Sequence, residues 1–203
     1  MDISIVLVLV ILGGIFIWVL SKIISKIKEW IEMWKYEKSE EYKDSLKSNE
    51  YYEKGKVHFQ EGDTDQAIAD YSEAILINPR YIVAYKERAE AYSKKGEIDQ
   101  AIADYSEAIH YSEAVGMNPD YIAAVYIERA EAYNKKGNID QAIADYSEAI
   151  RIVPDYTVAY KNRAEAYSKK GDTVQASSDF AQYQKLIARA VKAFEDYEKL
   201  HSS

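Results

Sequence analysis

The eleven-residue stretch "DQAIADYSEAI" occurs three times in this chain, at Asp65–Ile75, Asp99–Ile109 and Asp140–Ile150. The copies begin 34 and then 41 residues apart. Periods of about 20–50 residues are typical of stacked structural repeats, in which each unit buries its apolar face against its neighbours. The repetition therefore predicts a packing role for this segment and not a catalytic one.

Apolar residues around the second copy follow the spacing of two amphipathic helices. One face is made by Ile82, Tyr85, Ala89 and Tyr92, and the other by Ala101, Ile102, Tyr105, Ala108 and Ile109. Small residues at Ala89 and Ala101 should let the two helices approach closely, with tyrosines filling the space beside them. Gly96 is expected to end the first helix in a left-handed conformation.

Helix starts and stops also recur with the repeat. A capping residue stands three positions before a glutamine in each unit, at Asp63, Glu97, Asn138 and Asp172, of which Glu97 is the weakest cap. Pro79, Pro119 and Pro154 are expected to end the second helix of their units. Each unit therefore reads as helix, turn, helix.

Four units carry small and aromatic residues in phase. These residues are Gly55, Gly62, Ala67, Tyr71, Ala74 and Pro79; Tyr85, Ala89, Tyr92, Gly96, Ala101, Tyr105 and Ala108; Tyr126, Ala130, Tyr133, Gly137, Ala142, Tyr146, Ala149 and Pro154; Tyr160, Ala164, Tyr167, Gly171, Ala176, Phe180 and Tyr183. The pattern resembles the tetratricopeptide repeat (TPR). The resemblance implies an all-α fold, a right-handed α-solenoid of helix–turn–helix units at 48–81, 82–122, 123–156 and 157–190. We expect a C-terminal capping helix within 185–203.

The second unit is seven residues longer than the 34-residue period. Within it, "YSEAIH" at Tyr105–His110 is followed directly by "YSEAVG" at Tyr111–Gly116. Two interpretations stay open. The extra residues lengthen the second helix by about two turns and display His110, Tyr111 and Met117, or they form a loop.

Residues 3–20 form an apolar run in which only Ser4 is polar. A helix of that length spans roughly 27 Å, near the thickness of a hydrocarbon core, so residues 1–22 are predicted to be a transmembrane anchor. Because Lys22, Lys26 and Lys28 follow the run, we expect a single pass with the N-terminus outside and the repeats in the cytoplasm. The alternative is export after signal-peptide cleavage, which the Met-Asp start and the missing small-residue cleavage site disfavour.

Residues 23–47 are predicted to be a juxtamembrane amphipathic or spacer helix. Its apolar stripe consists of Ile23, Ile27, Trp30, Ile31 and Trp34. Such a stripe lies along lipid headgroups, or packs on the first repeat or on another copy of the chain. The sequence leaves these alternatives open.

Composition excludes several function classes. The chain has 26 basic and 34 acidic residues, and this net charge of −8 disfavours nucleic acid as a partner. There is no cysteine, and the three histidines do not have metal-ligand spacing. We therefore predict a protein that is not an enzyme and has no cofactor and no metal.

The resemblance implies that a protein or peptide partner binds in the groove lined by the first helix of each unit. The matching positions are Lys86, Glu87, Glu90, Lys94, Ile127, Glu128, Glu131, Lys135, Lys161, Asn162, Glu165 and Lys169. Chaperone-binding members hold a carboxylate with a basic and polar clamp, which Lys56 and Val158 interrupt here, so that partner is not inferred.

The charges of these groove positions allow two interpretations. Their acidic character favours a basic or mixed-charge partner. Alternatively, Glu90–Lys94, Glu131–Lys135 and Glu165–Lys169 are pairs along one solvated helix with no partner role. The leading hypothesis is a membrane-anchored interaction module, and the alternative is a membrane-tethered scaffold that self-assembles as a homo-oligomer.

Overall fold

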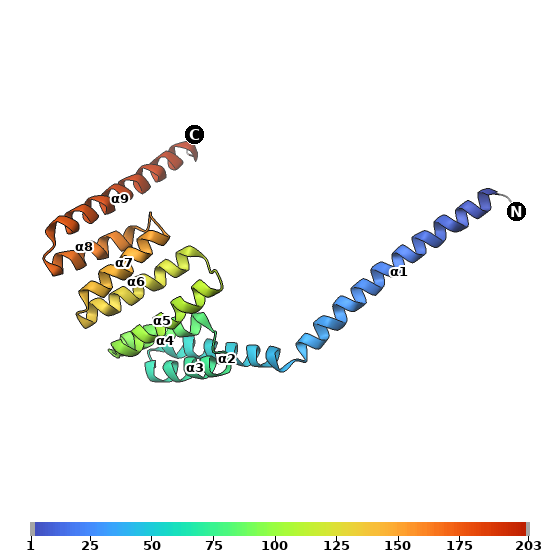
Figure 1. The fold of residues 1–203 in the computed structure, drawn as a ribbon, viewed down its shortest axis with the longest axis horizontal. Helices are drawn as coiled ribbons and strands as arrows, with labels where there is room; N and C mark the ends of the chain where they lie inside the picture. The colour runs from blue at the N-terminus through green and yellow to red at the C-terminus, as the bar shows by residue number, and fades with distance from the viewer. Residues whose placement is uncertain (1–2, 202–203) are drawn as a thin grey trace. The chain divides into compact units, whose positions relative to one another are not determined.

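A computed structural model describes the backbone of residues 3–201 and the side chains of residues 18–36, 38–199 and 201. It divides into two compact units, residues 1–47 and 48–203. The described residues form the helices α1 (Ile3–Glu37), α2 (Glu40–Glu61), α3 (Thr64–Ile77), α4 (Ile82–Lys95), α5 (Ile98–Ala114), α6 (Pro119–Lys136), α7 (Ile139–Ile152), α8 (Thr157–Lys170) and α9 (Thr173–His201) (Figure 1).

Successive helices of the unit 48–203 pack side by side. Helix α4 packs on α5, α6 on α7, and α8 on α9, and these pairs are joined through α3 with α4, α5 with α6, and α7 with α8 (Figure 1). From α3 to α9, each helix therefore packs on the next along the chain. This arrangement confirms the all-helical α-solenoid predicted from the repeat.

Alanine and tyrosine build the core, as the sequence predicts. Ala89 and Ala101 are fully buried where α4 meets α5, and Tyr105 fills the space beside them. The same residue types recur one unit later in Ala130, Ala142 and Tyr146. Because alanine removes bulk at the contact, two helix backbones approach closely while the tyrosine rings supply the buried apolar area.

The turns between paired helices are partly as expected. Gly96 ends α4 with φ of 87°, a left-handed conformation that glycine adopts without steric cost. Asp63 and Asp172 accept hydrogen bonds from the backbone N–H of Gln66 and Gln175, at 3.2 and 3.1 Å. Glu97 and Asn138 form no such side-chain cap.

The seven extra residues of the second unit are shared between two helices. Helix α5 has 17 residues where α3 and α7 have 14, and α6 has 18 where α4 and α8 have 14. The expectation that Pro119 ends a helix is wrong, because Pro119 opens α6 behind the N-cap Asn118. Proline fits the first turn because its missing N–H would have no partner there.

The C-terminal end of the array differs from the expectation of two separate helices. Helix α9 runs without interruption from Thr173 to His201, so the second helix of the last unit and the predicted capping helix are one element. Its sequence contains no glycine or proline to divide it.

The unit 1–47 contains α1 and the start of α2. The predicted helix over residues 23–47 is interrupted, because the Ser39 hydroxyl accepts from the Tyr42 N–H at 3.1 Å and so caps a new helix at Glu40. Within the residues whose side chains the structure describes, no helix is long and apolar enough to cross a membrane. Residues 3–17 of the predicted span 3–20 lie outside the residues whose side chains are described.

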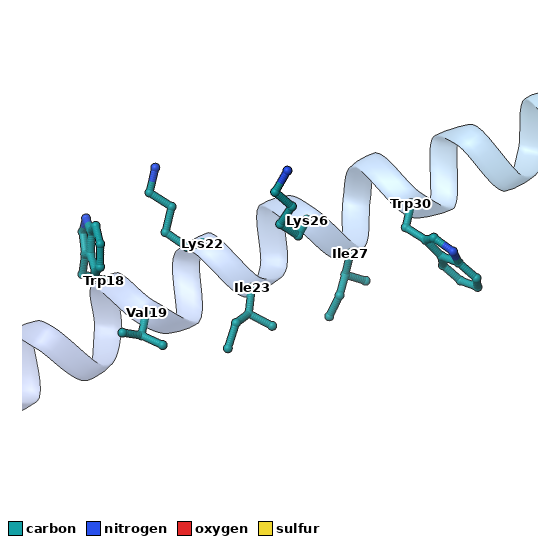
Figure 2. A pocket seen from close by; sticks show the side chains of 7 residues that line it. All are labelled: Trp18, Val19, Lys22, Ile23, Lys26, Ile27 and Trp30. Atoms are coloured by element: carbon teal, nitrogen blue, oxygen red, sulfur yellow. The ribbon is translucent and has the colours of Figure 1, made fainter.

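The predicted stripe on α1 is present and exposed. Figure 2 shows Val19, Ile23 and Ile27 on one side of the helix, with Lys22 and Lys26 on the other. The stripe continues through exposed Trp30, Ile31 and Trp34. The residues in Figure 2 all belong to one helix, so they form a surface stripe and not an enclosed cavity.

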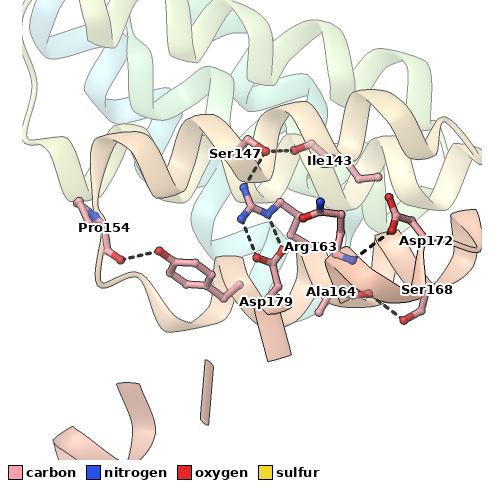
Figure 3. A network of polar contacts seen from close by, with 10 residues as sticks. Ile143, Ser147, Pro154, Arg163, Ala164, Ser168, Asp172 and Asp179 are labelled. Atoms are coloured by element: carbon pink, nitrogen blue, oxygen red, sulfur yellow. Dashed lines mark hydrogen bonds and ion pairs between the residues drawn. The ribbon is translucent and has the colours of Figure 1, made fainter. Parts of the chain in front are cut away.

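An ion-pair ladder that the sequence analysis did not predict joins the units. Figure 3 shows one step: the Arg163 guanidinium donates to both carboxylate oxygens of Asp179, at 2.7 and 2.8 Å, and to the Ser147 hydroxyl of the preceding unit at 2.9 Å. Equivalent steps consist of Arg88, Asp104 and Ser72, and of Arg129, Asp145 and Ser106. Each arginine thus ties its own helix pair to the unit before it.

The ladder stops at both ends of the array. In the first unit the buried Asp70 instead meets His58 Nδ1 at 2.6 Å. In the last unit Ala181 stands where Ser147 stands one unit earlier, so a further arginine would find no hydroxyl. The sequence of the terminal units therefore does not continue the ladder.

Gly55→Ala is expected to destabilise the chain, although alanine is normally better than glycine inside a helix. A Cβ at Gly55 would lie 2.7 Å from two ring atoms of Tyr71, which is fully buried and has no room to move. Overpacking of this kind costs about 1–3 kcal/mol. Urea unfolding followed by circular dichroism measures the change, and an increase in stability would contradict the close contact.

Candidate partner-binding groove

A pocket of about 410 Å³ lies between the first helices of the first three units. Its lining residues are Phe59 on α2; Glu90, Ser93 and Lys94 on α4; Tyr105 on α5; and Glu128, Glu131 and Lys135 on α6. Five of these residues are among the predicted groove positions. The structure therefore brings the central part of the predicted groove together around one hollow.

Lys86 and Glu87 flank this pocket. The Lys86 ammonium lies 3.2 Å from Glu128, 3.6 Å from Glu87 and 3.9 Å from Glu90. Burial lowers the pKa of Lys86, but these carboxylates together raise it above its ordinary value. Lys86 is therefore a fixed positive charge among glutamates.

The predicted positions of the last unit lie apart from the central pocket. Lys161 and Glu165 line a second hollow of about 260 Å³, together with Phe180. Asn162 donates to Glu131 at 3.0 Å and so connects the third and fourth units.

Ile127 departs from the expectation. Its side chain is 6% exposed and packs in the hydrophobic core with Ala130 and Tyr146. The extra turn of α6 precedes this residue, and its apolar side chain is drawn into the contact between units. Ile127 therefore serves packing and is not available to a partner.

The expected glutamate–lysine pairs along single helices do not form among the described residues. Lys94 instead lies over the Phe59 ring, with its ammonium 4.7 Å from the ring centre. Lys135 donates to Ser93 at 2.9 Å, and Lys169 to Asn134 at 2.9 Å. Each lysine thus reaches back to the first helix of the preceding unit, and the groove rim is a set of contacts between units.

Glu128 has the most perturbed carboxylate of the groove. Burial raises its pKa from 4.5 to about 7, Lys86 opposes this, and Glu90 and Glu87 add to it. The Glu128 side chain is 31% exposed, but its Oε2 atom is buried and has no hydrogen-bond partner. One oxygen of this carboxylate is therefore buried without a hydrogen bond.

Glu128 should make the stability of the chain fall as pH rises. Because its folded pKa of about 7 exceeds the ordinary 4.5, the folded chain keeps a proton that the unfolded chain has already released. The contribution is complete below about pH 4.5 and lost through pH 7, by about 1–3 kcal/mol. Urea midpoints from pH 4.5 to 8 measure it. Glu128→Gln should remove this component of the slope, whereas Glu131→Gln, an exposed carboxylate on the same helix, should keep it; equal slopes in all three chains would contradict the assignment.

Sequence reasoning missed several groove residues. Phe59 and Ser93 lie at equivalent positions of α2 and α4, so the repeat period applied to the first unit would have found Phe59. Tyr121 on α6 does not line the pocket, but its buried hydroxyl also has no hydrogen-bond partner, and burial raises its pKa to about 12. Tyr121 follows Pro119 by two residues, as Tyr81 follows Pro79 and Tyr156 follows Pro154, so the sequence does carry a signal for it.

Among the residues that the structure describes, no group of three or more histidine, cysteine or acidic side chains is placed to hold a metal ion. The groove instead offers carboxylates, ammonium groups, a phenol and one aromatic ring. These groups suit non-covalent recognition of a charged segment.

Two family models match this chain. The model described as "TPR repeat" matches residues 55–96 and 130–171, and the one described as "Tetratricopeptide repeat" matches residues 84–115. Together they take in about half of the chain, and the matched segments are the helix pairs that the structure stacks. The chain belongs to the tetratricopeptide-repeat family. It is therefore a TPR protein-interaction module.

Solved TPR structures share this fold at low sequence identity. A crystal structure of MamA matches with a TM-score of 0.64 at 24% identity, over 71% of this chain and 81% of that one. The first TPR domain of Spaghetti (RPAP3), bound to the HSP90 peptide SRMEEVD, matches with 0.56 at 24%, over 63% and 95%. BtubC (BKLC) from P. vanneervenii matches with 0.67 at 17%, over 72% and 65%. No curated protein matches the chain.

Proposed function

We propose that this TPR protein is a membrane-anchored interaction module that holds a segment of a partner protein in its groove. The observation that carries the proposal is the pocket between Phe59, Glu90 and Glu128, to which three successive first helices contribute. A segment that lies across those helices would contact all three units at once. The RPAP3 domain, whose structure contains a bound peptide, shows that this fold accommodates such a segment.

Site-specific photo-crosslinking tests the groove. A benzoylphenylalanine placed at Ser93, in the pocket wall, should capture a partner in cells that make the full chain. The matched control places the same group at Leu76, which is exposed on α3. Charge reversal at Glu90 and Glu131 should abolish the Ser93 product. Equal capture at both positions, or capture that survives charge reversal, would count against a partner in the groove.

The proposed anchor is the apolar run 3–20, with the repeats on the cytoplasmic side. The lysines after the run and the exposed Trp30 and Trp34 support this arrangement. The full chain should float with phospholipid vesicles, and a chain without residues 1–22 should not. Intact mass distinguishes the alternative of cleavage and export, and protease digestion of sealed membranes tests orientation.

A self-assembling scaffold is the alternative function, and α9 supports it. Apolar residues of α9 recur at seven-residue spacing in two series: Phe180, Ile187 and Phe194, and Tyr183, Ala190 and Tyr197. Phe180, Ile187, Phe194 and Tyr197 are exposed, and Lys185, Lys192 and Lys199 occupy the opposite face. A seven-residue period favours pairing with the same helix of a second copy. Light scattering of the full chain in detergent, against Phe194→Glu, tests it: an unchanged mass would exclude α9 pairing.

A further inference from the structure

The central pocket has more hydrogen-bond acceptors than the chain itself satisfies. Glu90, Glu128 and Glu131 surround it from two helices, and Glu128 Oε2 has no hydrogen-bond partner. The lysines of the lining, Lys94 and Lys135, direct their ammonium groups to Phe59 and Ser93 and not to these carboxylates. Lys86, beside the pocket, lies 3.2 Å from Glu128 and 3.9 Å from Glu90, so these two carboxylates share one ammonium group.

Tyr105 provides an observation independent of the carboxylates. Its side chain is 4% exposed and lines the pocket, yet its hydroxyl has no hydrogen-bond partner among the described residues. Tyr105 shares the lining with Glu128, Glu90 and Glu131, and burial and then these carboxylates raise its pKa. One unit later, the amides of Asn162 and Asn134 face the equivalent hydroxyl of Tyr146. The positions equivalent to these asparagines around Tyr105 are Glu128 and Ser93, which line the same pocket and offer the hydroxyl no amide.

We infer that this pocket is a binding site for one cationic side chain, an arginine or a lysine, carried by the partner segment. Such a group only donates hydrogen bonds, and the pocket offers it the oxygens of Glu90, Glu131, Glu128 and Tyr105. The inference rests on the proposed function and specifies what the groove recognises.

Phe59 shows that the rim already suits a cation. The Lys94 ammonium lies over its ring at 4.7 Å from the centre, a favourable cation–π distance. Lys94 is itself exposed, so it does not close the pocket. A guanidinium that enters between the glutamates would meet carboxylates inside and an aromatic edge at the rim.

Ligand-observed NMR titration of the full chain in detergent tests the site with blocked amino acids. N-acetyl-arginine amide and N-acetyl-lysine amide are the cationic probes, and N-acetyl-citrulline amide is the neutral control with nearly the same shape. At least one cationic probe should bind about tenfold more tightly than citrulline amide. The affinities of the arginine and lysine amides show which of the two side chains fits the site better.

Variants connect the binding to the named groups. Glu128→Gln should weaken the better cationic probe about fivefold or more, and Tyr105→Phe should weaken it less. Glu148→Gln is the matched control, because Glu148 pairs with Arg151 on α7 outside the pocket; it should change nothing. Circular dichroism checks that each variant is folded. Equal affinity for the cationic and citrulline amides, or wild-type affinity in Glu128→Gln, would overturn the inference.

A pH series adds a measurement of cation affinity that should not change with pH if Glu128 has only a structural role. The groups facing Glu128 are Lys86, Glu87 and Glu90 on α4, Tyr105 on α5, Tyr121 on α6 and Tyr156 before α8. Because burial raises the pKa of Glu128 to about 7, cation binding should strengthen from pH 6 to pH 8 in the wild type and less in Glu128→Gln. A pH-independent affinity in the wild type would contradict the role of Glu128.

The two proposals fail separately. If Ser93 captures a partner but the cationic and citrulline amides bind equally, the groove function stands and the cation site is wrong. If the cationic amides bind selectively but Ser93 captures no partner, the pocket is a site for small cations and the proposed partner function is wrong.

Discussion

Arg129→Ala should lower the free energy of unfolding by about 3–5 kcal/mol, the cost of leaving one partner of a buried ion pair without the other. The guanidinium donates to both oxygens of Asp145 at 2.8 Å and to Ser106 of the preceding unit at 3.0 Å. Asp145 is buried, so the truncated chain must hold an uncompensated carboxylate. Urea unfolding of the full chain, followed by circular dichroism, measures the loss.

Arg189→Ala is the matched control for this experiment. Arg189 pairs with Asp155 at 3.3 Å, but the two side chains are 76% and 68% exposed. An exposed pair contributes little, so the change should stay within about 0.5 kcal/mol. Arg129→Lys should fall between the two, because lysine keeps the charge but loses the bidentate geometry. Similar losses for Arg129→Ala and Arg189→Ala would mean that the ladder does not stabilise the array.

The fold could be predicted from the sequence because small and aromatic residues recur in phase in four units. A buried alanine beside a buried tyrosine, as at Ala101 and Tyr105, recurs in the first three units. The ion-pair ladder could also have been predicted from the sequence, since Arg88 and Asp104 recur one unit later as Arg129 and Asp145. It was missed because apolar periodicity does not show which charged residues are buried.

The irregular unit marks where prediction from the period ends. A period predicts what every unit shares, whereas the added lengths of α5 and α6, with 17 and 18 residues, have no counterpart in the 14-residue helices α3 and α4. Whether seven extra residues form a loop or helix depends on packing that is not local. The structure shares them between α5 and α6.

The groove could be predicted as a set of positions but not as a set of contacts. Helical spacing suggested that Lys135 pairs with Glu131 in its own helix, yet its ammonium bonds Ser93 on α4. The adjacent unit offers a partner that a single-helix pattern does not contain. Tyr105 and Glu128, whose buried Oε2 has no hydrogen-bond partner, are brought together in the same way, only when units stack.

Tyr146→Ala should lower stability by about 3–5 kcal/mol, because it removes a large buried ring and leaves a cavity. Tyr146 is 1% exposed and packs with Ala130, Ala142 and Ala149. These alanines have no side-chain atoms beyond Cβ with which to fill the space. We expect the urea midpoint to fall with little change in slope.

Phe180→Ala, measured in the same way, tests whether the loss of stability depends on burial of the aromatic ring and not on its presence alone. Phe180 occupies the position of Tyr146 one unit later, but it is 48% exposed because no further unit covers α9. Its truncation removes less buried area and should cost about 1 kcal/mol or less in a monomer. The ratio of the two losses therefore measures how much stability a neighbouring unit contributes. If Phe180→Ala cost as much as Tyr146→Ala, α9 would be covered in solution, and self-assembly through that helix would become the favoured function.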